Sequence, residues 1–242
     1  MAGSHDSPHG PIDSLDWLTQ DKLLELVAHD INNMCHAALS YVDLALDPKL
    51  APEARAKFLA TAKHMTHRAS RFAPHLKLFN ELRVTDSCAE PSDLLSKVAS
   101  DARIKAIDLN LGAPLALTTS GDALASRVRG GKFVTAAVVH LLDNAVRYQR
   151  SGASAAVSLD ARLDGDFVTV TVTDNGRGFA KGAEAYVAKR FTTPGSVSGA
   201  GLGLAFARLL AERAGGSVAV GAAPGAPPSG ALVRLRLPLA SP

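Results

Sequence analysis

The sequence predicts an α+β protein: an N-terminal antiparallel helical hairpin forming a dimeric four-helix bundle, followed by an α/β sandwich with a mixed sheet. Two observations predict this fold. The first part of the chain has two helical seams separated by a proline-containing turn, and the remainder alternates helix and strand patterns. We expect a flexible tail at residues 1–13, the hairpin at residues 14–83 and the sandwich domain at residues 84–242.

The hairpin is predicted from apolar residues that recur at steps of three and four. The first seam comprises Leu24, Val27, Ile31, Met34, Ala38, Tyr41 and Ala45, and the second comprises Phe58, Ala62, Met65, Ala69, Phe72, Leu76 and Phe79. Because residues 47–52 include two prolines, a short turn joins the helices and they lie antiparallel. One hairpin cannot bury such a stripe, so we expect a homodimer. The alternative is that the hairpin packs on its own C-terminal domain.

The C-terminal part alternates helical and strand patterns. Helices are expected at residues 94–106, 136–148 and 204–214, and strands at residues 155–163, 167–173, 217–220 and 231–237. Ser92 or Asp93 is the expected cap of the first of these helices. Residues 180–198 show no strong periodicity, and we expect a mobile loop there. This order suits a layer of helices on a mixed sheet.

Composition argues against several classes of protein. The net charge is +3 with no concentrated basic stripe, so nucleic acid is not an expected partner. Cys35 and Cys88 show no CxxC spacing, which favours a reducing compartment over a disulfide framework. No apolar run approaches the roughly 20 residues that span a bilayer. We therefore expect a cytoplasmic chain without membrane insertion, which would receive its signal from a separate sensor protein.

Three short strings in the second half give the strongest functional signal. They are His-Leu-Leu-Asp-Asn-Ala at residues 140–145, Asp-Asn-Gly-Arg-Gly-Phe at residues 174–179 and Gly-Ala-Gly-Leu-Gly-Leu at residues 199–204. Each string alone is more often an ordinary structural segment. Together, and in this order, they resemble the nucleotide pocket of the ATPase superfamily that holds DNA gyrase, heat-shock chaperone ATPases, mismatch-repair ATPases and histidine kinases. The resemblance covers residues 84–242.

The last string suits phosphate binding. Glycines placed directly before a helix let backbone N–H groups approach a phosphate, and here they are Gly199, Gly201 and Gly203, with Leu202 and Leu204 completing the string. The resemblance implies that Asp174 accepts a hydrogen bond from the adenine amine. Gly176 and Gly178 would allow a tight turn beneath the base.

The resemblance also implies a metal site. Asn144 would ligate the Mg²⁺ that bridges the phosphates, since an amide oxygen suits a hard cation. Arg147, one helical turn further on, could reach a phosphate. Tyr148 could cover the base, although a role as a core aromatic is at least as plausible. Lys189 and Arg190 lie in a stretch similar to a lid motif, where they would screen the γ-phosphate or form a solvated basic pair.

His140 stands where the gyrase-type hydrolases have the glutamate that activates water. Its presence favours phosphoryl transfer to a protein side chain over hydrolysis. Most histidine kinases have asparagine there, and the chemotaxis kinases are similar to this chain in having histidine.

A string in the first helix narrows the resemblance to histidine kinases. It reads His29-Asp30-Ile31-Asn32-Asn33, and the seam places His29 on the exposed side of the bundle. By this resemblance His29 accepts phosphate, Asp30 supports the reaction, and Asn33 positions water for removing phosphate from the partner. The proline usual shortly after this string is absent. An inert surface histidine is the alternative; His64 and His67 could bind a metal, but carboxylate and cysteine ligands are missing at suitable spacings.

The resemblance therefore implies a soluble protein-histidine kinase that uses ATP and Mg²⁺. It would autophosphorylate His29, transfer the group to an aspartate of a separate response regulator, and dephosphorylate that regulator. One alternative is a histidine phosphotransfer protein that relays phosphate between regulators without using ATP. Another is a serine kinase of the anti-sigma type, which the additional hairpin argues against.

Overall fold

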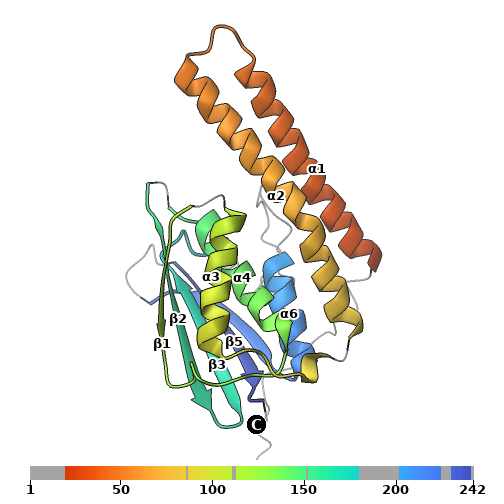
Figure 1. Cartoon of the computed structure of the whole chain (residues 1–242), viewed down its shortest axis with the longest axis vertical. Coiled ribbons are helices and arrows are strands. Elements are labelled where there is room, and N and C mark those ends of the chain that lie inside the picture. The colour runs from red at the N-terminus through yellow and green to blue at the C-terminus, as the bar shows by residue number, and fades with distance from the viewer. Residues whose placement is uncertain are drawn as a thin grey trace, which may run out of the picture.

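The computed structural model of the chain describes residues 20–85, 87–110, 113–150, 152–179, 202–224 and 230–240. Helices α1 (Gln20–Ala45) and α2 (Pro52–Val84) form an antiparallel hairpin that projects from an α/β module (Figure 1). The expected tail at residues 1–13 and the expected loop at residues 180–198 lie outside the described residues.

The parts of the predicted seams near the tip of the hairpin face each other. Ala38 and Ala45 of α1 and Ala62 of α2 are buried, and the rings of Tyr41 and Phe58 pack with centroids 5.9 Å apart. α2 begins at Pro52, where a proline loses no helical hydrogen bond because the first N–H groups of a helix are unpaired in any case. The predicted helical hairpin is therefore confirmed.

The α/β module contains five strands and three longer helices among the described residues. They are η2 (Ser87–Ala89, a short 3₁₀ helix), α3 (Leu95–Leu109), β1 (Leu115–Ser120), α4 (Lys132–Arg147), β2 (Ala155–Asp164), β3 (Phe167–Asp174), α6 (Leu202–Ala214), β4 (Ser217–Ala222) and β5 (Ala231–Pro238). The sheet has the order β1-β2-β3-β5-β4. β1 and β2 are parallel and the other neighbours are antiparallel, so the predicted mixed sheet is confirmed.

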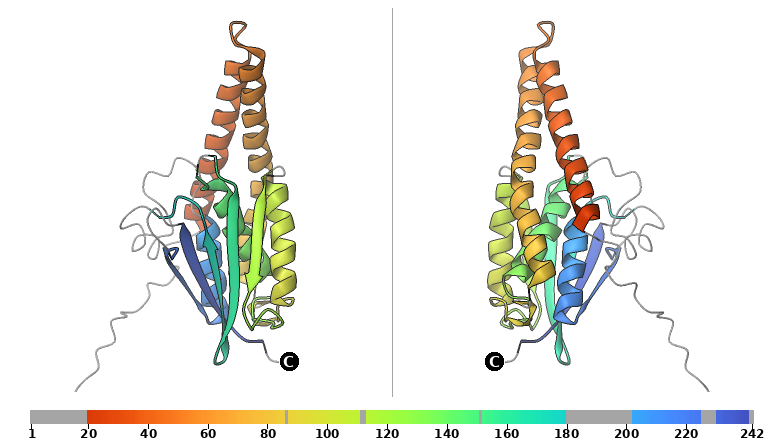
Figure 2. Two further views of the ribbon diagram at one scale, coloured as in Figure 1. Left: turned by 90° about the vertical axis from the view of Figure 1, so that its left-hand side faces the viewer. Right: turned by 90° about the vertical axis from the view of Figure 1, so that its right-hand side faces the viewer.

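The helices α3, α4 and α6 cover one face of the sheet (Figure 2). The alternation of β3 sends Val168, Val170 and Val172 into the core, as its Val and Thr pattern predicts. β2 and β3 pair through the turn at Gly165, whose φ of 59° lies in the left-handed region that glycine tolerates. The core therefore lies between the sheet and the helix layer.

The last turns of α2 pack into this module. Phe79 and Leu82 are buried, and Phe79 packs edge-on against Phe206 of α6 with ring centroids 5.9 Å apart. Packing of the hairpin on its own C-terminal domain, the alternative to a dimer, thus occurs for the end of α2. The division of the chain at residues 83 and 84 stays a prediction.

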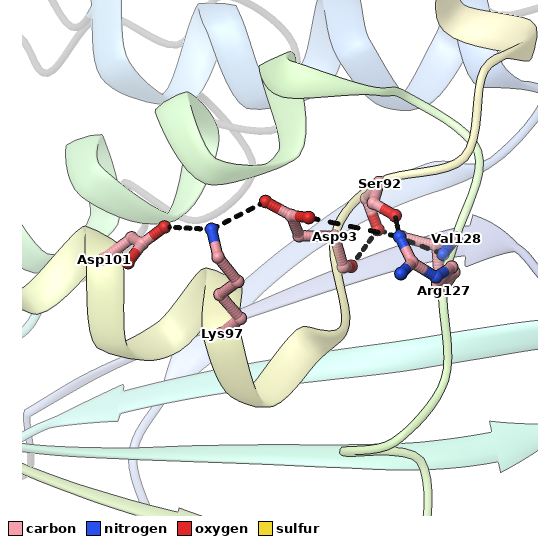
Figure 3. Close-up of polar contacts among 6 residues, drawn as sticks. All are labelled: Ser92, Asp93, Lys97, Asp101, Arg127 and Val128. Carbon is pink, nitrogen blue, oxygen red and sulfur yellow. Dashed lines mark hydrogen bonds and ion pairs between the residues drawn. The ribbon is translucent and has the colours of Figure 1, made fainter.

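The expected side-chain cap of α3 is wrong. Leu94 is the N-cap residue and makes no side-chain hydrogen bond there. The Ser92 hydroxyl instead donates to the carbonyl of Asp93 and accepts from the N–H of Val128, while the Asp93 carboxylate pairs with Lys97 (Figure 3). Tertiary contacts with the segment before α4 therefore fix these side chains.

Candidate nucleotide-binding site

Asp174 ends β3 and is held in place by backbone amides. Its Oδ1 accepts hydrogen bonds from the N–H of Gly176 at 2.7 Å and from the N–H of Ala231, on the neighbouring strand, at 3.1 Å. A carboxylate oriented by two fixed donors is a suitable acceptor for an exocyclic amine. The geometry is thus compatible with the adenine-binding role expected of Asp174.

The turn after Asp174 depends on glycine. A Cβ on Gly176 would lie 2.7 Å from the carbonyl oxygen of Tyr148 and 2.8 Å from Oδ1 of Asp174. Gly178 has a φ of 70°, which favours glycine. The N–H of Arg177 donates to the Tyr148 carbonyl at 2.9 Å, so the turn is joined to the end of α4.

Asn144 lies one helical turn before Tyr148 on α4 and faces the start of α6. A Cβ on Gly203 would lie 3.4 Å from Nδ2 of Asn144 and 3.1 Å from Cβ of His140. Glycine at position 203 therefore lets the start of α6 lie close to α4 without crowding His140. Asn144 thus lies beside the N-terminus of α6, a position suited to bound phosphates. Its amide offers the hard oxygen ligand that Mg²⁺ prefers.

Two further predicted residues lie at the end of α4. The Arg147 guanidinium lies 5.5 Å from the centroid of the Tyr148 ring, a cation–π distance. The Tyr148 backbone contacts the turn after Asp174, and its side chain is half-buried. The predicted contacts of these two side chains with phosphate and base stay predictions.

Other predicted residues cannot be placed. Lys189, Arg190, Gly199 and Gly201 lie outside the described residues, and for Leu202 the structure describes the backbone alone. Leu204 is buried in the module core, on the first turn of α6.

The predicted phosphate acceptor lies on the hairpin. His29 is exposed on α1, and the amide nitrogen of Asn33, one turn later, lies 3.2 Å from its Nδ1. Asp30 lies between them in sequence, within the same helix. An exposed imidazole is a chemically available nucleophile.

Comparison with known proteins agrees with this geometry. The family described as histidine kinase-, DNA gyrase B- and HSP90-like ATPase matches residues 131–241. The sensor protein KdpD of Escherichia coli is 34% identical over 135 residues, which are 54% of this chain and 14% of KdpD. The C4-dicarboxylate transport sensor protein DctB of Pseudomonas aeruginosa is 30% identical over 223 residues, which are 87% of this chain and 34% of DctB. The solved structure of the mycobacterial sensor histidine kinase MprB is 25% identical, with a TM-score of 0.53 over 62% of this chain and 98% of that chain.

Residues 131–241 match the ATPase family that includes histidine kinases, and the chain is similar to sensor histidine kinases. The ATPase match covers α4 and the following elements, and the similarity to DctB extends into the hairpin, because it covers 87% of the chain. The chain spans about a seventh of KdpD and a third of DctB. Within its described residues, no helix combines the length and the apolar character needed to cross a membrane.

A buried charge cluster between the hairpin and the module was not predicted from the sequence. Asp143, next to Asn144, forms an ion pair with Arg68 of α2 at 3.2 Å and accepts a hydrogen bond from Nδ2 of Asn110 at 2.9 Å. Burial alone would raise the pKa of Asp143, but the charges of Arg68 and Arg147 and these hydrogen bonds hold it below its ordinary value. Asp143 stood within a recognised string, yet the sequence held no signal for its partner on the hairpin.

His64 and His67 lie on the same side of α2 as this cluster. Nε2 of His67 lies 3.1 Å from the carbonyl oxygen of Asp108, and Nε2 of His64 is buried without a hydrogen-bond partner in the described part of the chain. No group of three or more metal-binding side chains is found among the described residues. His67 thus takes part in the contact between hairpin and module.

Proposed function

We propose that this chain is a protein-histidine kinase that binds ATP with Mg²⁺ in the α/β module and phosphorylates His29. The phosphoryl group then passes to an aspartate of a separate response regulator, and Asn33 supports its later removal from that regulator. A separate sensor protein would supply the signal that controls the reaction.

One observation supports the nucleotide site above all others: residues 59 positions apart, Asn144 and Gly203, lie against each other, and the turn after Asp174 joins the same end of α4. This arrangement unites an amide oxygen, a helix N-terminus and a fixed carboxylate. These are the groups that a metal ion, a phosphate and an adenine amine require.

The chemical step is a phosphoryl transfer. A nitrogen of the His29 imidazole attacks the γ-phosphorus, the bond to the oxygen bridging to the β-phosphate breaks, and ADP leaves. Asp30 accepts the proton that the imidazole loses. Mg²⁺ held by Asn144 would offset negative charge on the phosphates, and the protein contributes mainly positioning and charge compensation. His140 replaces the residue that activates water in related hydrolases, which favours transfer.

A homodimer is the proposed assembly. Leu39 and Val42 of α1, and Leu46 directly after it, follow one another at steps of three and four and form an exposed apolar stripe, with exposures of 62%, 37% and 72%. The intramolecular seam with α2 does not use them. A second hairpin seated on this stripe would complete the four-helix bundle.

Transfer of radiolabel from γ-labelled ATP tests the assignment of His29. The full chain is expected to acquire acid-labile label, and His29→Ala is expected to abolish it. His36→Ala is the matched control, because His36 is also exposed on α1, seven residues further on. Equal labelling of the parent and His29→Ala would refute the assignment.

Binding of an ATP analogue in the presence of Mg²⁺ separates the kinase from the relay protein. The kinase binds the analogue. A chain that binds none, yet accepts phosphate on His29 from a phosphorylated regulator, would be a relay.

A further inference from the structure

The buried ring of Phe206 is a meeting point of three helices. Phe206 lies on α6 and is only 1% exposed. Its ring centroid lies 5.2 Å from that of His140 and 6.4 Å from that of Phe133, both on α4, and 5.9 Å from that of Phe79, near the end of α2. The three pairs of rings are inclined by 56° to 62°, toward the edge-to-face arrangement that aromatic side chains favour. Figure 1 shows α6 between α4 and the end of α2, so this one ring contacts both neighbouring helices.

His140 contacts α6 at two successive turns. Gly203 lies three residues before Phe206, one turn earlier and on the same side of α6. A Cβ on Gly203 would lie 3.1 Å from Cβ of His140 and 3.4 Å from Nδ2 of Asn144, which is one turn further along α4. The contact between Phe206 and His140 therefore helps to fix how closely the start of α6, the expected phosphate-binding end, approaches the expected metal ligand Asn144.

Phe79 supports Phe206 from the hairpin. It is 3% exposed and belongs to α2, outside residues 131–241, which match the ATPase family. Its ring meets that of Phe206 at 62°, so the edge of one ring points toward the face of the other. An aliphatic side chain at this position would fill only part of the space and would leave Phe206 without this contact.

Two polar contacts fix the end of α2 against the helices of the candidate site. Nζ of Lys132, on α4, donates to Oε2 of Glu81 at 2.6 Å. Nη2 of Arg213, on α6, donates to the carbonyl of Thr85, directly after α2, at 2.7 Å. The last turns of α2 are therefore attached to both α4 and α6, and the ring of Phe79 keeps its place relative to both.

We propose that Phe79 and Phe206 are positioning residues of the nucleotide site. Phe79 holds the ring of Phe206, and Phe206 holds His140, so that the start of α6 stays at the distance from Asn144 that phosphate and Mg²⁺ require. This inference rests on the proposed function. It extends the supporting structure of the nucleotide site beyond the ATPase match, because Phe79 belongs to α2.

The test uses the full chain with two readouts. One is the affinity for a fluorescent ATP analogue in the presence of Mg²⁺, and the other is the NMR signal of the His140 ring, assigned by its loss in His140→Gln. Phe79→Leu keeps an apolar side chain but removes the aromatic ring. It is expected to lower the analogue affinity about fivefold, a factor typical of one aromatic pair, and to shift or broaden the His140 signal.

Leu82→Val is the matched control. Leu82 lies on α2, about one turn after Phe79, and is completely buried. Both substitutions remove buried carbon atoms, so both are expected to lower the thermal midpoint. Leu82→Val is expected to retain the analogue affinity and the His140 signal of the parent, because it removes no aromatic contact.

Phe206→Leu tests whether the effect passes through His140. Alone, this substitution is expected to lower the analogue affinity about tenfold, because it removes all three ring contacts. In a chain that already carries His140→Gln, it is expected to lower the affinity at most about threefold, since the effects of coupled residues do not add. Additive losses would overturn the inference. Phe79→Leu supplies the decisive measurement if Phe206→Leu does not fold.

Two other outcomes would also overturn the positioning role. One is an analogue affinity in Phe79→Leu equal to that of the parent, and the other is an equal loss of affinity in Phe79→Leu and Leu82→Val. If the parent binds no analogue while its His140 signal still responds to Phe79→Leu, the positioning of His140 stands and the proposed function fails.

Discussion

Asp174, the last residue of β3, accepts a hydrogen bond of 3.1 Å from the backbone N–H of Ala231, the first residue of the neighbouring strand β5. The N–H of Gly176 binds the same oxygen, Oδ1, at 2.7 Å. Both hydrogen bonds of this carboxylate within the described part of the chain use Oδ1, so under the proposed function Oδ2 is the oxygen that accepts from adenine. Gly230 permits this arrangement, because a Cβ there would overlap the Asp174 backbone.

This geometry makes Asp174→Asn a selective test of adenine recognition. The amide oxygen can still accept from Gly176 and Ala231, so the thermal midpoint is expected to change little. The amide NH₂ would take the place of Oδ2, so two hydrogen-bond donors, this NH₂ and the adenine amine, would face each other. The affinity for an ATP analogue is therefore expected to fall at least about tenfold. Titration with a fluorescent analogue measures it.

Asp166→Asn is the matched control, since Asp166 lies in an exposed turn of the same hairpin. Unchanged analogue affinity in Asp174→Asn would contradict the assigned role, whatever the control shows.

Gly203→Ala tests the close approach of α6 to α4. The new methyl group would lie 3.1 Å from His140 and 3.4 Å from Asn144, and overpacking of this kind costs about 1–3 kcal/mol. Alanine gains about 1 kcal/mol of helix propensity over glycine, so the net loss of stability is expected to be at most about 2 kcal/mol. Analogue affinity is expected to fall about fivefold or more, because relief of the contact with His140 would shift the start of α6 relative to Asn144.

Gly221→Ala controls for the substitution itself, because a Cβ at Gly221 meets nothing within 4 Å. An affinity equal to that of the parent in Gly203→Ala would show that Asn144 does not need this approach. Denaturant unfolding and analogue titration provide the two measurements.

If the exposed apolar stripe of Leu39, Val42 and Leu46 forms the dimer interface, negative charges placed on it should separate the dimer. Leu39→Asp combined with Leu46→Asp is expected to convert the proposed dimer to a monomer, since desolvated carboxylates would face each other across the bundle. Light scattering coupled to size exclusion reports the mass. Ile104→Asp, on an exposed apolar residue of α3, is expected to leave the mass unchanged. A monomeric parent, or a double variant of dimeric mass, would remove this stripe from the interface.

His64 predicts a pH dependence of stability. Burial lowers its pKa from 6.5, and the charges of Arg68, His67 and Arg147 act in the same direction against the opposing charge of Asp143. Because the folded chain prefers the neutral imidazole, this contribution to stability is complete above pH 6.5 and is lost as the pH falls below it. The thermal midpoint of the parent should therefore fall more than that of His64→Gln between about pH 7.5 and about pH 5.5.

His36→Gln supplies the comparison for that experiment, because His36 is exposed on α1. It is expected to show the same pH dependence as the parent. An equal loss of stability in the parent and His64→Gln would mean that His64 does not titrate differently on folding.

Much of the fold follows from local patterns that a sequence displays directly. The step of three and four predicted both hairpin helices, and the alternation of Val and Thr predicted β3, because side-chain direction in helices and strands repeats with fixed periods. The strings around Asn144 and Asp174 predicted the family for a similar reason: glycine and carboxylate at fixed spacing are local requirements of a nucleotide site.

The sequence by itself thus determined the helical hairpin, the mixed sheet and the similarity to histidine kinases, while the residues assigned to the nucleotide stay a prediction. Only the tertiary structure decided which side chains from distant segments meet: Ser92 with Val128 instead of the start of α3, Phe79 with Phe206, and Arg68 with Asp143. The physical reason is that periodicity fixes the direction of a side chain within its own element. Its partner depends on how the elements pack, and no local pattern records the 75 residues that separate Arg68 from Asp143.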